Sequence, residues 1–419
     1  MNGRMRRGIV ITGMALILSF VILTPTVQSA EKRGPIRIGF LSAFSGGFAA
    51  ESEYLRNGFD LFLGRINYTV AGRKIEVLHE DDKNDPRTGL VKTQRLVEEK
   101  QVHMIAGVFT STIAYAIREY VVGKKIPFIV THAAADLLTQ TEFTPYIFRT
   151  SFTNSQGAHV DGDYLYKKGH RRLIVLASDF SAGYENIGGF CRVFKDAGGE
   201  IVEEIYTPVG TIDFAPYLSR ISPDRADGLF AFLGGADRIN LVNQYAQYGL
   251  KEKVPMFGAG ILSEEVLTEM GDNAIGMMDG YYYKTSSNLK NKEHLDFIKS
   301  YKQKFGKMPI GKAEVSYVAA QLITKALQTI QGNIEDTDAF IKAMESVEVA
   351  APRGPFKLDK YHNPIQNIDI ALCKKQAKEY YFDIVETYPH VSQFWKWKPE
   401  EFMKMPLYKD LKGKWAKGS

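Results

Sequence analysis

Hydroxyl side chains follow the apolar run that begins at Met104 and stops at Gly107. Ser111 or Thr112 then takes the position of a helix N-cap. Apolar residues recur at helical spacing beyond it, at Ile113, Ile117 and Tyr120. The first-turn amides of such a helix are unpaired and partly positive, so with the hydroxyls they can hold a carboxylate or phosphate without lysine or arginine. An ordinary capped helix after a buried strand has the same pattern, so this turn is a candidate anion site that needs further support.

Short apolar runs and helical patterns alternate along most of the 419 residues. The first half predicts strands over residues 36–41, 74–80, 104–107 and 127–130. After residue 150 the alternation restarts, with strands predicted over residues 173–177, 201–206, 229–233 and 255–258. This order is typical of parallel sheets covered by helices, so we predict an α/β fold of two doubly wound parallel-sheet lobes. A later helix over residues 314–331 is expected to return to the first lobe.

The predicted strand ends share small residues. In parallel sheets, ligands bind outside the carboxyl ends of the strands. These ends fall at residues 42–47, 107–112, 131–135, 178–183, 234–236 and 258–261, all of which are rich in Gly, Ala, Ser and Thr. Small residues let a ligand approach backbone amides, although tight turns contain them too. Their repetition in both halves favours a cleft between two facing sheets that closes by hinge motion.

The first thirty residues have the pattern of a secretory signal peptide. Three arginines precede an apolar run over residues 8–23, and Pro25 and small residues up to Ala30 follow. Polar residues interrupt the run, and it falls short of the roughly 20 apolar residues of a membrane span. We therefore expect a soluble exported protein, with cleavage after Ser29 or Ala30.

The net charge is concentrated at the two ends of the chain. Of the formal charge of +5, residues 1–30 carry +3 and residues 396–419 carry +4, which leaves −2 for the body. Without a basic body, nucleic acid binding loses its main support. The tail over residues 385–419 is rich in aromatic residues as well as lysine, so we expect it to pack over the hinge side rather than extend into solvent.

Cysteine usage and known catalytic motifs point away from a disulfide scaffold and from an enzyme. Only Cys191 and Cys373 occur, and Cys191 shares an apolar helical face with phenylalanines, which favours buried free thiols. No Gly-x-Ser-x-Gly elbow, His-Glu-x-x-His pair or P-loop is present, and the eight histidines are scattered singly. We therefore expect neither catalysis nor a cofactor or metal site.

An ordered series of motifs resembles the leucine/isoleucine/valine-binding proteins of bacterial ABC importers. It comprises residues 36–46, Asn57-Gly58, residues 81–86, the turn at 107–112, Arg149-Thr150 and Gln156-Gly157, within a match over roughly residues 36 to 375. The resemblance implies a type I periplasmic binding fold, with lobe 1 over residues 31–150 and 285–351 and lobe 2 over residues 151–284 and 352–384. Hinge crossovers are expected near residues 150, 284 and 352. It also implies a periplasmic monomer that binds a small carboxylate or amino acid and delivers it to a membrane permease. A sensor without transport would use the same cleft.

Only some residues of the family's amino-acid site have a matching residue in this sequence. Ser111 matches the family serine that holds a carboxylate. The α-ammonium partners do not match, because the family threonine falls on Ala134, a backbone acceptor falls on His132 and an acidic residue falls on Gly260. Family aromatics fall near Tyr184 and Glu51, and the family's paired cysteines fall on Asn84 and Thr110. We interpret Arg149 as a residue that supports the hinge.

Two interpretations of the ligand follow. In one, Glu51 or Asp237 takes over the ammonium, and the ligand is an amino acid. In the other, which we favour, the ligand is an aromatic or otherwise apolar acid without an amine, because an unpaired buried ammonium would cost several kcal/mol and aromatic residues are frequent near the predicted cleft. His132 is then a possible donor to the carboxylate. The candidate ligand-binding residues are Phe48, Glu51, Phe109, Thr110, Ser111, His132, Ala133, Ala134, Tyr184, Ala236 and Gly260.

Overall fold

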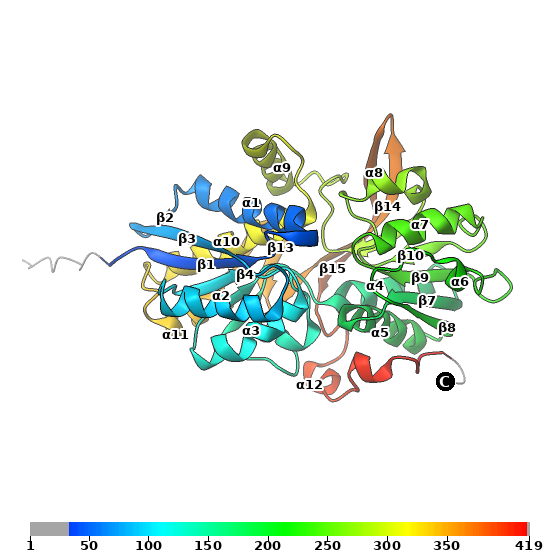
Figure 1. Cartoon of the computed structure of the whole chain (residues 1–419), viewed down its shortest axis with the longest axis horizontal. Helices are drawn as coiled ribbons and strands as arrows, with labels where there is room; N and C mark the ends of the chain where they lie inside the picture. The colour runs from blue at the N-terminus through cyan, green and yellow to red at the C-terminus, as the bar shows by residue number, and fades with distance from the viewer. Residues whose placement is uncertain (1–32, 417–419) are drawn as a thin grey trace, which may run out of the picture. The chain divides into compact units, whose positions relative to one another are not determined.

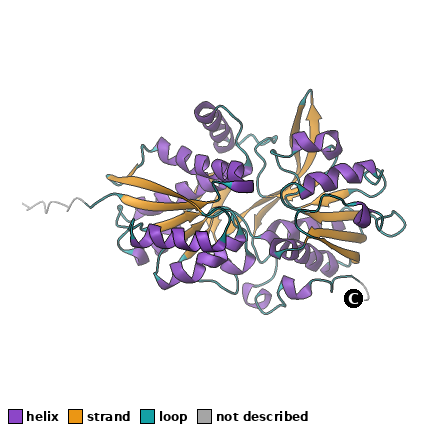
Figure 2. Ribbon diagram, viewed as in Figure 1, coloured by secondary structure: helices purple, strands orange, loops and turns teal. Residues whose placement is uncertain are grey.

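The computed structural model describes residues 33–416. The signal peptide expected over residues 1–30 lies outside this range. Residues 35–419 form one compact unit, and its described part contains a six-stranded and a nine-stranded sheet (Figures 1 and 2). We call the part built on the six-stranded sheet the first lobe and the part built on the nine-stranded sheet the second lobe. The predicted α/β fold class is confirmed.

The first lobe is a mostly parallel sheet in the order β2-β3-β1-β4-β5-β6. Its strands are β1 (Ile36–Ser42), β2 (Thr69–Val70), β3 (Arg73–Asp81), β4 (Met104–Gly107), β5 (Phe128–Val130) and β6 (Ile147–Arg149). The short β2 pairs antiparallel to β3, and the other neighbours run parallel. Side chains of β4 and β5 are buried throughout, as strands covered on both faces require.

Helices from two distant parts of the chain belong to the first lobe. The early helices are α1 (Ala49–Arg65), α2 (Pro86–Glu98) and α3 (Ser111–Gly123), and the late ones are α9 (Lys292–Phe305), α10 (Gly311–Thr329) and α11 (Thr337–Ser346). Helix α10 packs along α1, so the predicted return of this segment to the first lobe is confirmed. The buried Val315, Ala319 and Leu322 belong to the apolar face that drives this packing.

The second lobe has the order β12-β13-β14-β11-β10-β9-β7-β8, with β15 paired to β14. Its strands are β7 (Arg172–Ser178), β8 (Glu200–Thr207), β9 (Gly228–Phe232), β10 (Met256–Gly258), β11 (Met278–Tyr281), β12 (Val349–Ala351), β13 (Gly354–Leu358), β14 (Pro364–Gln376) and β15 (Glu379–Val391). The helices between them are α4 (Asn154–Lys167), α5 (Ser181–Asp196), α6 (Ala215–Leu218), α7 (Asp237–Gln247) and α8 (Leu267–Met270). Strands β7 to β11 are parallel, whereas β14 and β15 form a long antiparallel hairpin.

A buried polar cluster joins the segments that pass between the sheets. The Arg353 guanidinium donates to Glu314 of α10, to the Gln366 side chain of β14 and, at 3.2 Å, to the Ser151 carbonyl. The side chains of Arg353 and Glu314 are fully buried, so each charge needs the other. Arg149 is also buried and donates to the carbonyls of Phe152 and Ala135, a contact pattern that fits a hinge support.

The C-terminal extension begins later than expected, and it packs on the protein instead of extending into solvent. Residue 385 falls inside β15, so the second sheet continues to Val391. The following segment, with α12 (Pro399–Phe402), packs chiefly against the second lobe (Figure 1). There the Tyr408 hydroxyl lies 2.9 Å from His159 Nε2, and its ring lies under the Arg192 guanidinium. A contact toward the first lobe is made by the Gln393 amide, which donates to the Thr139 carbonyl at 3.0 Å.

Both cysteines are buried free thiols, as the sequence predicts for Cys191. Within residues 33–416, no helix has the length and apolar character needed to cross a membrane.

Candidate functional site

A cavity of about 460 Å³ lies where the strand ends of the two sheets meet. First-lobe turns after β4 and β5 contribute Ser111 and His132 to its lining, and second-lobe turns after β9 and β10 contribute Gly235 and Gly260. These turns are among the small-residue strand ends that the sequence identifies. The cavity therefore occupies the predicted place, between two facing sheet edges.

Three helices that line this cavity begin there without side-chain caps. Their N-cap residues are Thr110 for α3, Phe180 for α5 and Ala236 for α7, and among the described residues no side chain caps them. The sequence placed the first N-cap at Ser111 or Thr112, whereas α3 begins at Ser111. This correction has a local reason, because the extended Thr110 turns its hydroxyl to the Asn84 side chain, 2.7 Å away, instead of to the helix. Free amides and aligned helix dipoles make such starts attractive to anions.

Aromatic rings form much of the wall. Phe109 stacks on His132 with centroids 4.4 Å apart and contacts Phe48 at 4.8 Å. Across the cavity lining, Phe152 stacks on Tyr282 with centroids 4.7 Å apart. The remaining Phe and Tyr side chains in the lining are Phe180, Phe232 and Tyr281. This wall offers a flat apolar group extensive van der Waals contact.

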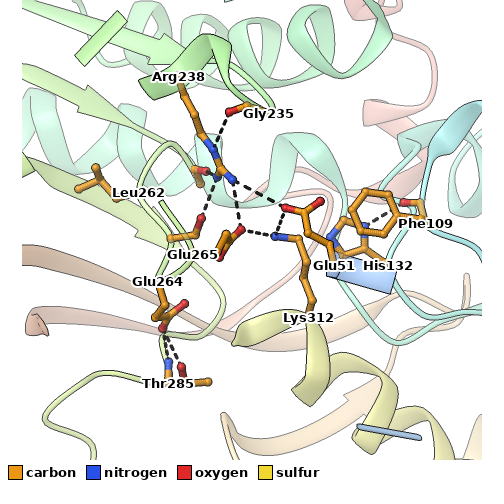
Figure 3. A network of polar contacts seen from close by, with 12 residues as sticks. Glu51, Phe109, His132, Gly235, Arg238, Leu262, Glu264, Glu265, Thr285 and Lys312 are labelled. Atoms are coloured by element: carbon orange, nitrogen blue, oxygen red, sulfur yellow. Dashed lines mark hydrogen bonds and ion pairs between the residues drawn. The ribbon is translucent and has the colours of Figure 1, made fainter. Parts of the chain in front are cut away.

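A network of four charged residues joins the two lobes at one end of the cavity (Figure 3). Lys312 of α10 lies 2.5 Å from Glu265, in the loop after β10, and 3.3 Å from Glu51 of α1. Arg238 of α7 lies 3.1 Å from Glu265 and 3.9 Å from Glu51. Two of these pairs, Lys312 with Glu265 and Arg238 with Glu51, cross between the lobes and connect them.

The network favours the charged forms of Glu265 and Lys312. Burial alone would raise the pKa of Glu265, but the charges of Lys312 and Arg238 lower it well below its ordinary value. Burial alone would lower the pKa of Lys312, but Glu265 and Glu51 raise it instead. The two cations and two carboxylates balance, so the network adds little net charge to the cavity.

His132 is a hydrogen-bond acceptor toward the cavity, which corrects its predicted role. Its Nδ1 atom lies 2.9 Å from the Phe109 carbonyl oxygen, and a carbonyl can only accept, so Nδ1 carries the proton. Burial, and then the charge of Lys312, lower the pKa of His132 to about 4, so the ring is neutral at neutral pH. The unprotonated Nε2 would repel a carboxylate. In this tautomer and charge state Nε2 is an acceptor, which disfavours the role of carboxylate donor considered from the sequence.

Eight of the candidate residues line the cavity: Phe48, Glu51, Phe109, Thr110, Ser111, His132, Ala134 and Gly260. Ala133, Tyr184 and Ala236 are not among its lining residues. Ala133 is buried in the first-lobe core, and Ala236 is the exposed N-cap residue of α7. The Tyr184 hydroxyl instead donates to Asp179 at 2.6 Å, and Lys412 of the extension lies over its ring.

Several lining residues were missed by the sequence analysis. Phe180 and Phe232 lie within or just before small-residue strand ends, so the rule that identified those ends could have included them. Arg238 follows the Gly-Gly-Ala turn after β9 and could have been noticed in the same way. Lys312 had no such signal, because it comes from a late helix that reaches the cavity only through its packing on α1.

A two-lobed protein with an anion-attracting, aromatic-lined cavity between its lobes is of the solute-binding class. The model of a family described as periplasmic binding protein matches residues 35–378. The chain therefore belongs to the periplasmic binding protein family, which confirms the resemblance found in the sequence.

Three individual proteins illustrate what this chain is similar to. The Leu/Ile/Val-binding protein homolog 6 of Brucella melitensis biotype 1 is 29% identical over 385 residues, covering 89% of this chain and 96% of that protein. An ABC transporter substrate-binding protein from Sphaerobacter thermophilus is 33% identical, with a TM-score of 0.83, over 86% of this chain and 99% of the other. A solute binding protein of an ABC transporter from Rhodopseudomonas palustris BisB5, in complex with 3,4-dihydroxy benzoic acid, is 31% identical, with a TM-score of 0.80, over 86% of this chain and 98% of the other.

Proposed function

We propose that this chain is the solute-binding component of an ABC importer and captures an aromatic carboxylate between its two lobes. The observation that carries the proposal is the presence, in one cavity, of three uncapped helix starts and a wall of aromatic rings. The helix starts offer amide donors to a carboxylate, and Ser111 adds a hydroxyl. The rings offer contact to the apolar body of the solute.

The polar contacts in the cavity favour an acid without an amine. Glu51, one of the two candidate partners for an ammonium, is paired with Lys312 and lies close to Arg238. The other candidate, Asp237, already accepts from the Gly210 amide at 2.9 Å. An α-ammonium would have to compete for these carboxylates or remain unpaired, which costs several kcal/mol in a closed cavity. The aromatic acid bound to the Rhodopseudomonas palustris relative is of the class that we propose.

Function then consists of capture and release. The lobes close on the solute through the hinge near Arg353, and the two cross-lobe ion pairs, Arg238 with Glu51 and Lys312 with Glu265, stabilise the closed form. We expect the protein to act as a monomer in the periplasm, exported by residues 1–30, and to pass its solute to a membrane permease. No cofactor is required for this cycle.

The test compares solutes by thermal shift and calorimetry on the secreted protein. We expect benzoate to raise the melting temperature and to bind at least about tenfold more tightly than leucine, a difference of about 1.4 kcal/mol. Acetate is the control for a carboxylate without a ring. Stabilisation by leucine with none by benzoate would replace this proposal with the amino-acid alternative.

A further inference from the structure

The bonding state of His132 limits the groups that it can recognise. Because Nδ1 donates to the Phe109 carbonyl at 2.9 Å and the ring is neutral, Nε2 holds a lone pair and no proton. Phe109 stacks on the ring with an interplanar angle of 13°, which fixes the direction of that lone pair. Within the described part of the chain, no hydrogen bond is made to Nε2. Figure 3 shows the ring beside Phe109, and His132 is one of the residues that line the cavity.

A solute group that meets Nε2 must therefore donate a hydrogen. The common donors on a small organic acid are an ammonium and a hydroxyl. An ammonium would come close to Lys312, whose charge is near enough to lower the pKa of His132. Glu51 and Glu265 offset an added positive charge poorly, because both are already paired with Lys312. A neutral hydroxyl avoids this repulsion and can also accept a hydrogen bond from a cation.

We propose that His132 selects solutes whose aromatic ring carries a hydroxyl group, by accepting the hydroxyl hydrogen at Nε2. This inference rests on the proposed function, since it takes the carboxylate to lie at the helix starts and the ring to lie among the aromatic side chains. A ring without the hydroxyl would cover Nε2 and leave a buried acceptor unpaired. Sites built around a hydrogen bond discriminate strongly against solutes that cannot make it.

The first experiment measures dissociation constants by calorimetry for benzoate, its 2-, 3- and 4-hydroxy derivatives and the methoxy analogue of the tightest hydroxy isomer. We expect one hydroxy isomer to bind at least about tenfold more tightly than benzoate. The methoxy analogue keeps the oxygen but cannot donate, so it should lose this advantage. A methoxy analogue that binds as tightly as the hydroxy isomer would overturn the inference. The site would then discriminate between solutes by size or polarity and not by a donated hydrogen.

Two substitutions separate the nitrogens of the ring. His132→Asn places an amide near the position of Nδ1, where it can still donate to the Phe109 carbonyl, and removes the acceptor at Nε2. His132→Gln reaches the position of Nε2 with an amide oxygen that can accept. We expect the His132→Asn variant to bind hydroxybenzoate and benzoate with affinities within about threefold of each other. The His132→Gln variant should retain part of the preference for hydroxybenzoate.

The matched control is His170→Asn. His170 also bonds a backbone carbonyl through Nδ1, that of Asp227 at 3.1 Å, but does not line the cavity. This variant should keep the full preference, and melting temperatures establish that each variant is folded. Equal binding of benzoate and all hydroxy isomers would overturn the role of His132 and leave the proposed function standing. Binding of none of these acids would overturn both.

Discussion

At the scale of single residues, Ser111 combines two kinds of donor. It is the first residue of α3, so its amide belongs to the unpaired first turn, and its side chain lines the cavity. The N-cap residue Thr110 does not use its side chain on the helix, because its hydroxyl bonds Asn84. The helix start therefore remains available to a solute, which explains why an uncapped start is tolerated here.

Replacing Ser111 by alanine should weaken carboxylate binding by about 1 to 3 kcal/mol, because one donor is lost while the backbone amides remain. Calorimetry with benzoate measures this change. Ser219→Ala is the control, since its hydroxyl donates to the Pro216 carbonyl on the exposed α6 turn, outside the cavity lining. Unchanged affinity in Ser111→Ala would remove the helix start from the carboxylate site.

At the scale of elements, the first lobe depends on the contact between α1 and α10. Gly58 of α1 lies so near α10 that a Cβ atom added to it would be 1.8 Å from the Ala313 carbonyl oxygen. Helix α10 then carries Lys312 into the cavity, one residue before this contact. A close approach of two backbones thus fixes the position of a charged group in the site.

Gly58→Ala should destabilise the protein by at least about 2 kcal/mol, because the new methyl group forces the two helices apart. Urea unfolding followed by circular dichroism measures the change. Gly64→Ala is the matched control in the same helix, where the nearest atom to an added Cβ is the flexible Lys304 Nζ at 3.1 Å. This control should be neutral or more stable by up to about 1 kcal/mol, as alanine favours helices. Equal stability of the two variants would contradict the packing argument.

At the scale of the whole molecule, the two lobes also meet through a pair of buried acids. Asp136 of the first lobe follows β5, and Glu185 belongs to α5 of the second lobe; the Asp136 amide donates to the Glu185 carboxylate at 3.4 Å. Burial raises the pKa of Asp136 to about 6. Burial, and then the charge of Asp136, raise the pKa of Glu185 well above its ordinary value. Both acids thus bind a proton more readily in the folded chain than in the unfolded chain.

This pair predicts a pH dependence of stability. Below pH 3.8, the ordinary value for Asp136, folded and unfolded chains both bind its proton. Between there and pH about 6 only the folded chain holds it, so the contribution of Asp136 to the free energy of unfolding falls as pH rises and then stays low. Asp136→Asn should remove this fall, so its melting temperature should exceed that of the wild type increasingly from pH 4 to pH about 6. The exposed Asp224→Asn should follow the wild type, and a pH-independent difference for Asp136→Asn would contradict the prediction.

The order of elements and the place of the cavity could be read from local sequence. Each strand run, each helix spacing and each small-residue turn is a property of a few consecutive residues, and the handed α/β connection then places all the turns at one edge of a sheet. Ser111 was identified in this way. The β14–β15 hairpin was not, because its turn after Gln376 has Ala377 at φ 54° instead of the usual Asn or Gly.

The sequence by itself determined the parallel parts of two sheets, the strand ends at the cavity and an anion-attracting helix start at Ser111, because these depend on periodicity and turn chemistry along the chain. Only the tertiary structure decided that Phe180 and not Tyr184 lines the cavity, that Glu51 is paired with Lys312, and that Nδ1 of His132 is bonded to the Phe109 carbonyl. These outcomes depend on which groups from distant segments come within about 3 to 4 Å of each other. The spacing of residues along the chain does not predict such short-range contacts.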